Sequence, residues 1–375
     1  MRMKKLLILA VAATTLVACS KTYDSAPAQP QAIGFGTWAE TVTRARTITD
    51  GAFSADDNFN VFGSKVIGSA TPAVVFNGDV VTASGSSPLV WNYAPPRYWD
   101  PNADGGYTFY AISPAGLLPS TMTDAQKTTA ATTGAFSTDE LTFDGTVAYD
   151  VLIADETHVA TGNSGSPVNL LFNHAASLLD VKVKKSYALQ HATVKVTAIS
   201  LENIINKGTL AVSAYNGSTN KPTIAIANWT PAASSATTTF TGTVESGGTT
   251  LTQYGYADVS GEALAGTANY FWQNFVVMPQ TLVAASETNP QLIKISYTIT
   301  TNVGEVTEHT NKTVAFSLFD NADNKVNTDT AAASGWNPNT HYIYTLTLDA
   351  NKIEFSAEIA DWSSTVVNGF YNLVL

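Results

Sequence analysis

The stretch SLLDVKVKK, residues 177–185, alternates apolar and polar side chains with a period of two. One face of an extended chain would carry the apolar residues Leu179, Val181 and Val183. The other face would carry the charged residues Asp180, Lys182 and Lys184. A strand whose side chains alternate in this way has one face on a core and one face toward solvent. The stretch therefore predicts a β-strand that covers a hydrophobic core.

Similar short runs recur on both sides of this stretch, at spacings typical of a β-sandwich. Examples are FNVFGSKVI (59–67), YTFYAIS (107–113), VNLLFNH (168–174), LIKISYTIT (292–300) and HYIYTLTLD (341–349). Asn77-Gly78 and Asp104-Gly105-Gly106 are turn signals between such runs. Helical signals are few, and we expect a turn or two of helix within 123–134 and within 173–179. The sequence thus predicts an all-β chain.

The length of 375 residues allows two domains with full-sized cores. We place the boundary near Asn173, which predicts an N-terminal β-sandwich over 33–172 and a C-terminal one over 173–365. Residues 20–32, SKTYDSAPAQPQA, lack apolar periodicity and are typical of a flexible tether. The last ten residues, 366–375, form a separate candidate strand.

The N-terminus is typical of an export signal. A basic start, MRMKK, precedes an apolar run that is too short to cross a bilayer about 30 Å thick as a stable helix. The run ends at Leu16-Val17-Ala18-Cys19, which resembles a bacterial lipobox. Cys19 is the one cysteine of the chain, so the fold contains no intrachain disulfide. We expect a signal peptide over 1–18 and a lipid on Cys19, which begins a tether over 19–32 and anchors the chain to a membrane.

Composition and motifs exclude several function classes. The net charge of −11, without a basic stripe, argues against nucleic-acid binding. No phosphate-binding loop, dinucleotide fingerprint or HExxH motif occurs, and we expect no cofactor and no metal. His174 and His341 lie beside apolar runs and are interpreted as structural residues. We therefore expect a binding or structural protein and not an enzyme.

Aromatic residues crowd the stretch WNYAPPRYWDP, residues 91–101. Exposed aromatic faces could form a carbohydrate platform. The alternative, which we favour, is a rigid corner that packs on the sheet, because YTFYAISP follows and supplies further rings.

Several of these stretches occur in an order that resembles the fimbrillin family of Bacteroidetes, the subunits of lipoprotein-derived type V pili. They are the lipobox, Thr43-Arg44-Ala45, the aromatic block 91–114, FNHAASLLDVKV (172–183) and the stretch 337–364 that ends in IEFSAEIADWSS. The resemblance covers nearly the whole chain after Cys19. It implies two transthyretin-like β-sandwiches in tandem, export as an outer-membrane lipoprotein precursor, and later residence in a cell-surface fimbrium that serves adhesion. Its implied partners are other pilus subunits and an arginine-specific protease that removes the first strand.

The resemblance suggests a role for two of the four arginines. Arg44 and Arg46 lie one residue apart in TVTRARTITD, residues 41–50. A trypsin-like protease needs an arginine in an exposed, extended segment. Cutting here would release the strand IGFGTW, whose residues include Ile33, Phe35 and Trp38. Ile33, Phe35 and Thr37 would share one face of this strand. Chance placement of two arginines on a solvated loop is the alternative.

The tail could supply the replacement strand. Val367, Tyr371, Leu373 and Leu375 share one face if residues 366–375 are extended. They could fill the place of the first strand in a neighbouring molecule, or the tail could be the last strand of its own sheet. Ser25 and Thr330 lie in Asp-Ser-Ala and Asp-Thr-Ala sequences that resemble O-glycosylation sites of this phylum. A second function remains open, that of a monomeric surface lipoprotein which binds a glycan or a host protein through aromatic loops.

Overall fold

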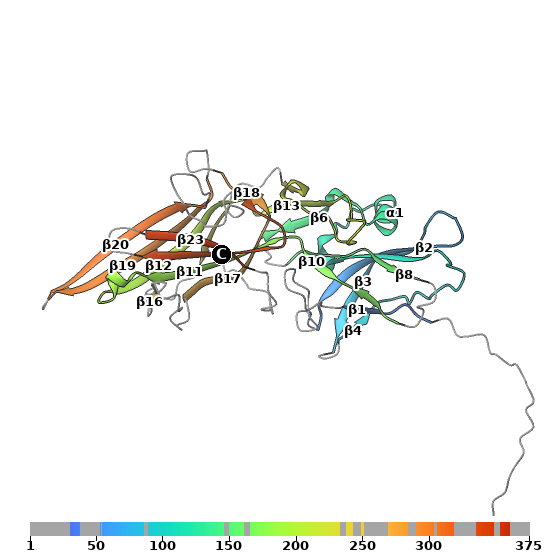
Figure 1. Ribbon diagram of the computed structural model, residues 1–375, viewed down its shortest axis with the longest axis horizontal. Coiled ribbons are helices and arrows are strands. Elements are labelled where there is room, and N and C mark those ends of the chain that lie inside the picture. The colour runs from blue at the N-terminus through green and yellow to red at the C-terminus, as the bar shows by residue number, and fades with distance from the viewer. Residues whose placement is uncertain are drawn as a thin grey trace, which may run out of the picture.

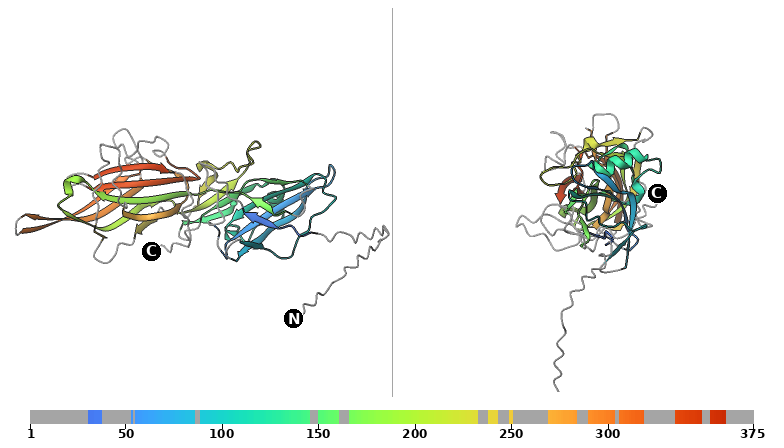
Figure 2. Two further views of the ribbon diagram at one scale, coloured as in Figure 1. Left: turned by 60° about the horizontal axis from the view of Figure 1, so that its bottom comes forward. Right: turned by 90° about the vertical axis from the view of Figure 1, so that its right-hand side faces the viewer.

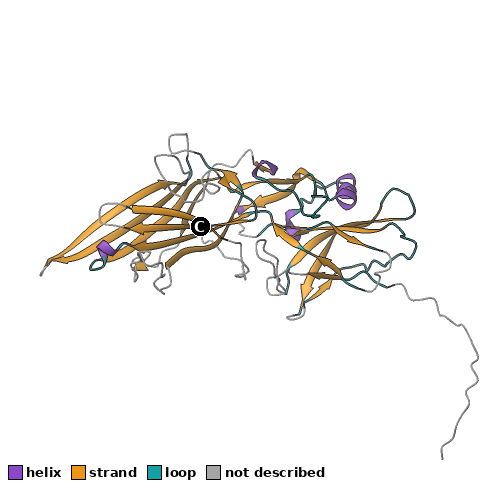
Figure 3. Cartoon of the chain, viewed as in Figure 1, coloured by secondary structure: helices purple, strands orange, loops and turns teal. Residues whose placement is uncertain are grey.

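The computed structural model describes residues 31–37, 53, 55–85, 89–145, 150–160, 166–232, 238–242, 249–250, 269–283, 290–303, 306–318, 335–348 and 353–360. Strands dominate this part of the chain (Figure 3), which confirms the all-β prediction. The described α-helix is α1, Asp124–Thr133, which is longer than the turn or two expected there. The short 3-10 helices are η1 (Ala115–Leu117), η4 (Tyr187–Leu189) and η5 (Ile226–Asn228). Within these residues, no helix has the length and hydropathy that a membrane span requires.

The described strands form an elongated body, with the strands of the first half toward one end and those of the second half toward the other (Figure 1, Figure 2). A seven-stranded sheet occupies the first end, in the order β10-β7-β5-β2-β3-β4, with β8 paired to β5. Its strands are β2 (Asn58–Val66), β3 (Ala73–Ser84), β4 (Val90–Asn92), β5 (Gly106–Ser113), β7 (Leu152–Ala154), β8 (Thr157–Val159) and β10 (Phe172–His174).

A second, smaller layer covers one face of this sheet. It contains β1 (Phe35–Thr37) and β9 (Val168–Leu170), which pair in parallel. The core between the layers is rich in aromatic rings, including Phe59, Phe76 and Phe109. Alternation along β2, β3 and β5 places these rings on one face, because successive side chains of a strand point to opposite sides.

Two sheets that share one core make up the other end of the molecule. One sheet has the order β17-β11-β22-β23, from β11 (Ser177–Lys185), β17 (Asn269–Val277), β22 (Thr340–Leu348) and β23 (Ile353–Ala360). The other has the order β15-β12-β19-β20, with β16 also on β12, from β12 (Thr193–Ile204), β15 (Thr238–Gly242), β16 (Thr249–Thr250), β19 (Leu292–Val303) and β20 (Val306–Ser317).

Strand β11 confirms the alternation from which its fold was predicted. Leu179, Val181 and Val183 are all buried in the shared core. Asp180 was expected to face solvent, but it is 3% exposed, and His341 of the neighbouring strand β22 lies 3.1 Å from its carboxylate. The opposite face of β11 is therefore covered at this position.

Residues from both sides of the proposed boundary meet in a three-stranded sheet of order β14-β13-β6. Its strands are β6 (Phe136–Asp144), β13 (Lys207–Val212) and β14 (Trp229–Pro231). A separate short pair joins β18 (Gln280–Thr281) to β21 (Gly335–Trp336). Since β6 precedes Asn173 and β13 follows it, this sheet connects the two halves. The boundary at 173 and the transthyretin-like tandem stay predictions.

Two further local predictions were wrong. Asn77-Gly78 was expected to form a turn, but it lies inside β3 as a β-bulge, where Val61 pairs with Asp79 and Phe62 with Asn77. Gly78 has φ +87°, a conformation that occurs both in glycine-containing bulges and in the tight turns of hairpins. The helical turn expected in 173–179 is absent, because these residues end β10 and begin β11.

Candidate functional site

Among the residues predicted for lipidation, cleavage, strand exchange or glycosylation, the structure describes two, Ile33 and Phe35. The others lie outside the described residues: Cys19, Ser25, Trp38, Arg44, Arg46, Thr330, Val367, Tyr371, Leu373 and Leu375. We therefore build the candidate site around residues 31–37, which we call the first strand.

The first strand lies between two backbone segments, residues 97–99 and β9, which we call its two walls. On one side it runs antiparallel to residues 97–99: Ile33 N–H donates to the Arg97 carbonyl (2.8 Å), and Trp99 N–H donates to the Gln31 carbonyl (3.0 Å). On the other side it runs parallel to β9, and Val168 N–H donates to the Gly34 carbonyl (2.8 Å). Since both edges of the first strand are paired, it is an internal strand of its layer.

The apolar side chains of the first strand point into the aromatic core, as the alternation predicts. Ile33 is 1% exposed and Phe35 is 7% exposed. Four rings surround Phe35, with centroid distances of 5.4 Å to Phe76, 5.7 Å to Tyr93 and 6.0 Å to both Phe59 and Phe109. All four contacts are edge-on, the geometry that aromatic pairs prefer. Phe35 is thus the centre of a cluster of aromatic rings.

Tyr93 links this cluster of rings to the backbone of the first strand. Its hydroxyl donates to the Ile33 carbonyl at 2.6 Å and accepts from the Arg97 N–H at 3.2 Å. Burial raises the pKa of Tyr93 above its usual value, so the hydroxyl keeps the proton that it donates. Both peptide groups of Ile33 are therefore bound, the N–H by the Arg97 carbonyl and the C=O by Tyr93.

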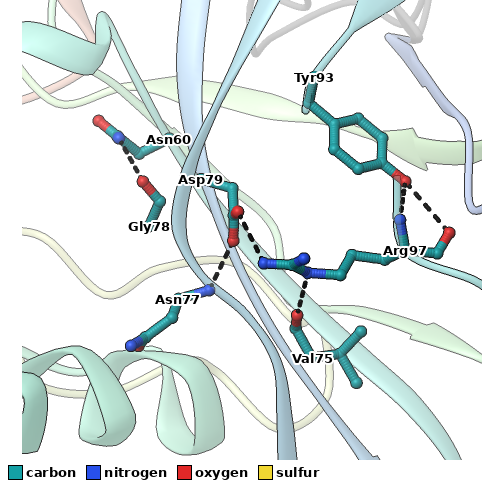
Figure 4. A network of polar contacts seen from close by, with 7 residues as sticks. All are labelled: Asn60, Val75, Asn77, Gly78, Asp79, Tyr93 and Arg97. Atoms are coloured by element: carbon teal, nitrogen blue, oxygen red, sulfur yellow. Dashed lines mark hydrogen bonds and ion pairs between the residues drawn. The ribbon is translucent and has the colours of Figure 1, made fainter. Parts of the chain in front are cut away.

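A polar network holds the Arg97 side chain against the bulge of β3 (Figure 4). Its Nε donates to the Val75 carbonyl, and a terminal nitrogen pairs with the Asp79 carboxylate, both at 3.1 Å. The second oxygen of Asp79 accepts from the Asn77 N–H at 3.0 Å. The side chain of Arg97 is 35% exposed and that of Asp79 is 15% exposed, so the pair is partly shielded from solvent.

The segment with the two candidate cleavage arginines begins and ends at this core. Phe35 lies on its N-terminal side, and Phe53 on its C-terminal side packs against Trp91 (5.1 Å) and Phe172 (5.5 Å) in the same cluster. A cut between the two phenylalanines would separate the first strand covalently from a core whose other residues all stay with the body of the chain.

The aromatic stretch 91–101 is built into the site as the favoured interpretation predicted. Trp91 and Trp99 are buried, and Tyr93 packs against the same cluster. Tyr98 is 50% exposed, with its backbone opposite Ala32. Because both indole rings lie in the core, they are not available as a carbohydrate platform.

The positions of His174 and His341 support a structural interpretation. His174 Nδ1 lies 2.5 Å from the Asp150 carboxylate, and both side chains are largely buried. His341 Nε2 pairs with Asp180 at 3.1 Å. Within the described residues, no group of three or more His, Cys, Asp or Glu side chains could hold a metal ion.

Sequence reasoning missed the roles of Tyr93 and Arg97. Arg97 had one available signal, since it is an arginine in an arginine-poor chain and stands between aromatic residues. Nothing in the sequence placed it against Val75 and Asp79, about twenty residues earlier.

Comparison with known proteins gives a family match. A model of the fimbrillin-like family matches residues 43–362. No curated protein matches the chain.

Several solved structures resemble the chain at low identity. A protein from Bacteroides uniformis, described as a candidate cell adhesion protein, is 14% identical, with a TM-score of 0.46 over 89% of this chain and 98% of that one. The tip fimbrial protein Mfa3 from Porphyromonas gingivalis is 10% identical, with a TM-score of 0.35 over 84% and 96%. The fimbrial anchor protein Mfa2 from the same species is 9% identical, with a TM-score of 0.31 over 89% and 98%.

Proposed function

The chain belongs to the fimbrillin-like family, and on that premise we propose that it is a structural subunit of a type V pilus that serves adhesion. It is exported as an outer-membrane lipoprotein precursor and joins other subunits by strand exchange in a cell-surface fimbrium. Membership in this family agrees with the expectation that the chain is not an enzyme.

The first strand is the observation that carries this proposal. Ile33 and Phe35 are buried among side chains from distant parts of the sequence. Burying two such side chains contributes roughly 3–6 kcal/mol. That contribution is comparable with the net stability of a typical domain, about 5–15 kcal/mol. A body that loses this strand has a strong drive to bind another.

Removing the first strand would also leave backbone groups without partners. The carbonyl of Arg97 and the N–H groups of Trp99 and Val168 all bond to the first strand. Unpaired groups along a strand edge are a template for another extended chain. Main-chain hydrogen bonds would supply affinity for that chain, and the sites vacated by Ile33 and Phe35 would select its side chains.

Cleavage at Arg44 or Arg46 by an arginine-specific protease is the proposed trigger. Both arginines lie in the segment that joins the first strand to Phe53. A cut there would release Ile33, Phe35 and Trp38 together with the lipid on Cys19. The subunit would then leave the membrane and remain attached through its neighbours.

The donor strand in this proposal is the tail, 366–375, of a neighbouring subunit. Ten extended residues reach about 33 Å. Val367, Tyr371, Leu373 and Leu375 would share the face that enters the site. The tail follows β23 closely in sequence, so the alternative that it pairs within its own sheet remains part of the test.

Blocking both cleavage sites tests the proposal. We expect the Arg44→Ala/Arg46→Ala double variant to keep its first strand, shown by intact mass, and to form no SDS-resistant ladder after treatment with an arginine-specific protease. Each single variant reports which arginine is cut, and Lys127→Ala, a basic residue of α1, is the matched control. A double variant that is still shortened and still forms the ladder would exclude these arginines as the trigger.

A monomeric binding function through aromatic loops is the alternative. Trp91 and Trp99, the two indole rings of the stretch 91–101, are buried, and Tyr98 is the large aromatic residue of that stretch that is exposed. A chain that stays monomeric after complete processing, and that binds glycans, would favour it. The glycosylation of Ser25 and Thr330 also stays a prediction, which intact peptide masses can check.

A further inference from the structure

Arg97, through its side chain and its backbone, joins three parts of the chain that are far apart in sequence. Its guanidinium bonds to β3 on both sides of the bulge, at Val75 and Asp79. Its backbone carbonyl accepts from Ile33, and its backbone N–H donates to the Tyr93 hydroxyl. The same residue thus forms part of the wall beside the first strand and fixes that wall to the main sheet.

The bulge of β3 makes this attachment possible. Strand β4 pairs with residues 82–84 of β3, so Val75 and Asp79 lie beyond its end. The bulge directs the Asn77 N–H to the Asp79 carboxylate, and the Gly78 carbonyl accepts from the Asn60 side chain at 2.9 Å. Asp79 is therefore also held by a bond that does not involve Arg97. An arginine can reach a carbonyl and a carboxylate at once because its donors form a rigid fork.

We propose that Arg97 is a latch that holds the first strand in place and sets how often it detaches, a role that rests on the proposed strand exchange for its biological purpose. The guanidinium keeps residues 93–97 against β3. This position puts the Tyr93 hydroxyl and the Arg97 carbonyl on the two peptide groups of Ile33. Loss of the guanidinium frees the wall, and the strand then opens more often.

The latch acts on one strand, not on the whole fold. The bonds of the guanidinium go to an edge carbonyl and a partly exposed carboxylate, while the main sheet pairs through its own backbone ladders. Local opening and global unfolding are separate processes with separate free energies. A positioning role therefore predicts faster opening at the first strand with little change in the central strands.

Amide hydrogen exchange on the intact chain measures this opening directly. The reporter amides are those of Ile33, Trp99 and Val168, because each of their hydrogen bonds joins the first strand to a wall. In Arg97→Met we expect exchange at all three amides to rise about tenfold. Two charge-assisted hydrogen bonds are lost, and their contribution is reduced because the Arg97 side chain is 35% exposed. Arg97→Lys keeps the charge without the fork and should show a smaller rise.

One control variant and one second test variant distinguish the latch from a general loss of stability. Lys207→Met removes a lysine whose ion pair with Asp144, at 2.8 Å, joins β13 to β6, and it should leave the three reporters unchanged. Asp79→Asn removes the partner of Arg97 and should raise the reporters in the same direction, which keeps the test usable if Arg97→Met folds poorly.

The proposal is overturned if the reporters in Arg97→Met exchange as in the wild type. It is equally overturned if amides of β2 and β5 rise by the same factor, since Arg97 would then support the whole sheet. The measurement needs neither cleavage nor assembly. If exchange at the reporter amides rises in Arg97→Met but the chain never polymerises, the proposed function alone is refuted. If the chain polymerises but exchange at the reporters is unchanged in Arg97→Met, the latch alone is refuted.

Discussion

Replacing Phe35 with alanine should be among the most damaging single changes in the precursor. Phe35 is 7% exposed and lies edge-on to four rings within 6.0 Å. Truncating a buried phenylalanine to alanine costs about 3–5 kcal/mol, because transfer free energy is lost and a cavity remains. We expect the upper part of this range, since contacts between aromatic rings add about 0.5–1.5 kcal/mol per pair beyond buried area.

Urea unfolding of the uncleaved chain provides the assay. The first half of the chain should unfold at a lower urea concentration in Phe35→Ala, with a free energy of unfolding lower by about 4–5 kcal/mol. Val90→Ala is the control, because Val90 is 54% exposed on β4 and its truncation should stay within about 0.5 kcal/mol. A loss below about 1 kcal/mol for Phe35→Ala would show that the first strand contributes little, and the argument for strand exchange would lose its energetic basis.

Four further predictions concern the two ends of the chain and the Tyr110–Tyr215 contact. Cys19→Ala should leave an uncleaved, mislocalised precursor, and normal outer-membrane processing of this variant would contradict the lipobox. Deleting 366–375 should give a folded, processed monomer without fibres; fibres would place the donor strand elsewhere, and an unfolded product would place the tail in its own sheet. Gly134→Ala should destabilise the chain by more than about 1 kcal/mol, because φ is +67° and a Cβ would lie 2.4 Å from the Tyr110 ring and 2.5 Å from Tyr215; thermal unfolding measures this loss. Burial raises the pKa of Tyr215, so above pH 10 the hydroxyl ionises in the unfolded chain but stays protonated in the folded one. The free energy of unfolding that Tyr215 contributes is therefore present below pH 10 and is lost as pH rises above 10. Between pH 9 and 11, Tyr215→Phe should lose about 1.4 kcal/mol less stability than the wild type in urea titrations.

Local sequence pattern predicted the parts of the fold that depend on alternation. The core face of β11 and the inward positions of Ile33 and Phe35 follow from a period of two. The pattern worked because a strand with one buried face must place its apolar residues on every second position.

Local pattern failed where one signal serves two structures. Asn77-Gly78 indicates a residue with positive φ, and a bulge satisfies that requirement as well as a hairpin turn does. Residues 173–179 have side chains that are compatible with a helix. Their pairing with neighbouring strands determined the structure instead.

The site itself was only half visible in the sequence. Its apolar half follows from the alternation in the first strand. Its polar half depends on Arg97, Asp79 and Tyr93 meeting across separate segments, and no local rule predicts such a meeting. The resemblance to a family suggested why a first strand could leave, but not what holds it.

The two walls of the first strand run in opposite directions, and this has a consequence for any substitute. The first strand is antiparallel to residues 97–99 and parallel to β9. A strand that enters with the reverse polarity would be parallel to residues 97–99 and antiparallel to β9, so it would again form one parallel and one antiparallel ladder. Side chains at alternate positions point inward in either direction. Backbone pairing is therefore close to symmetric under reversal, and the order of side-chain shapes along the incoming strand, an aliphatic group at one end and an aromatic ring at the other, must decide which way round it binds.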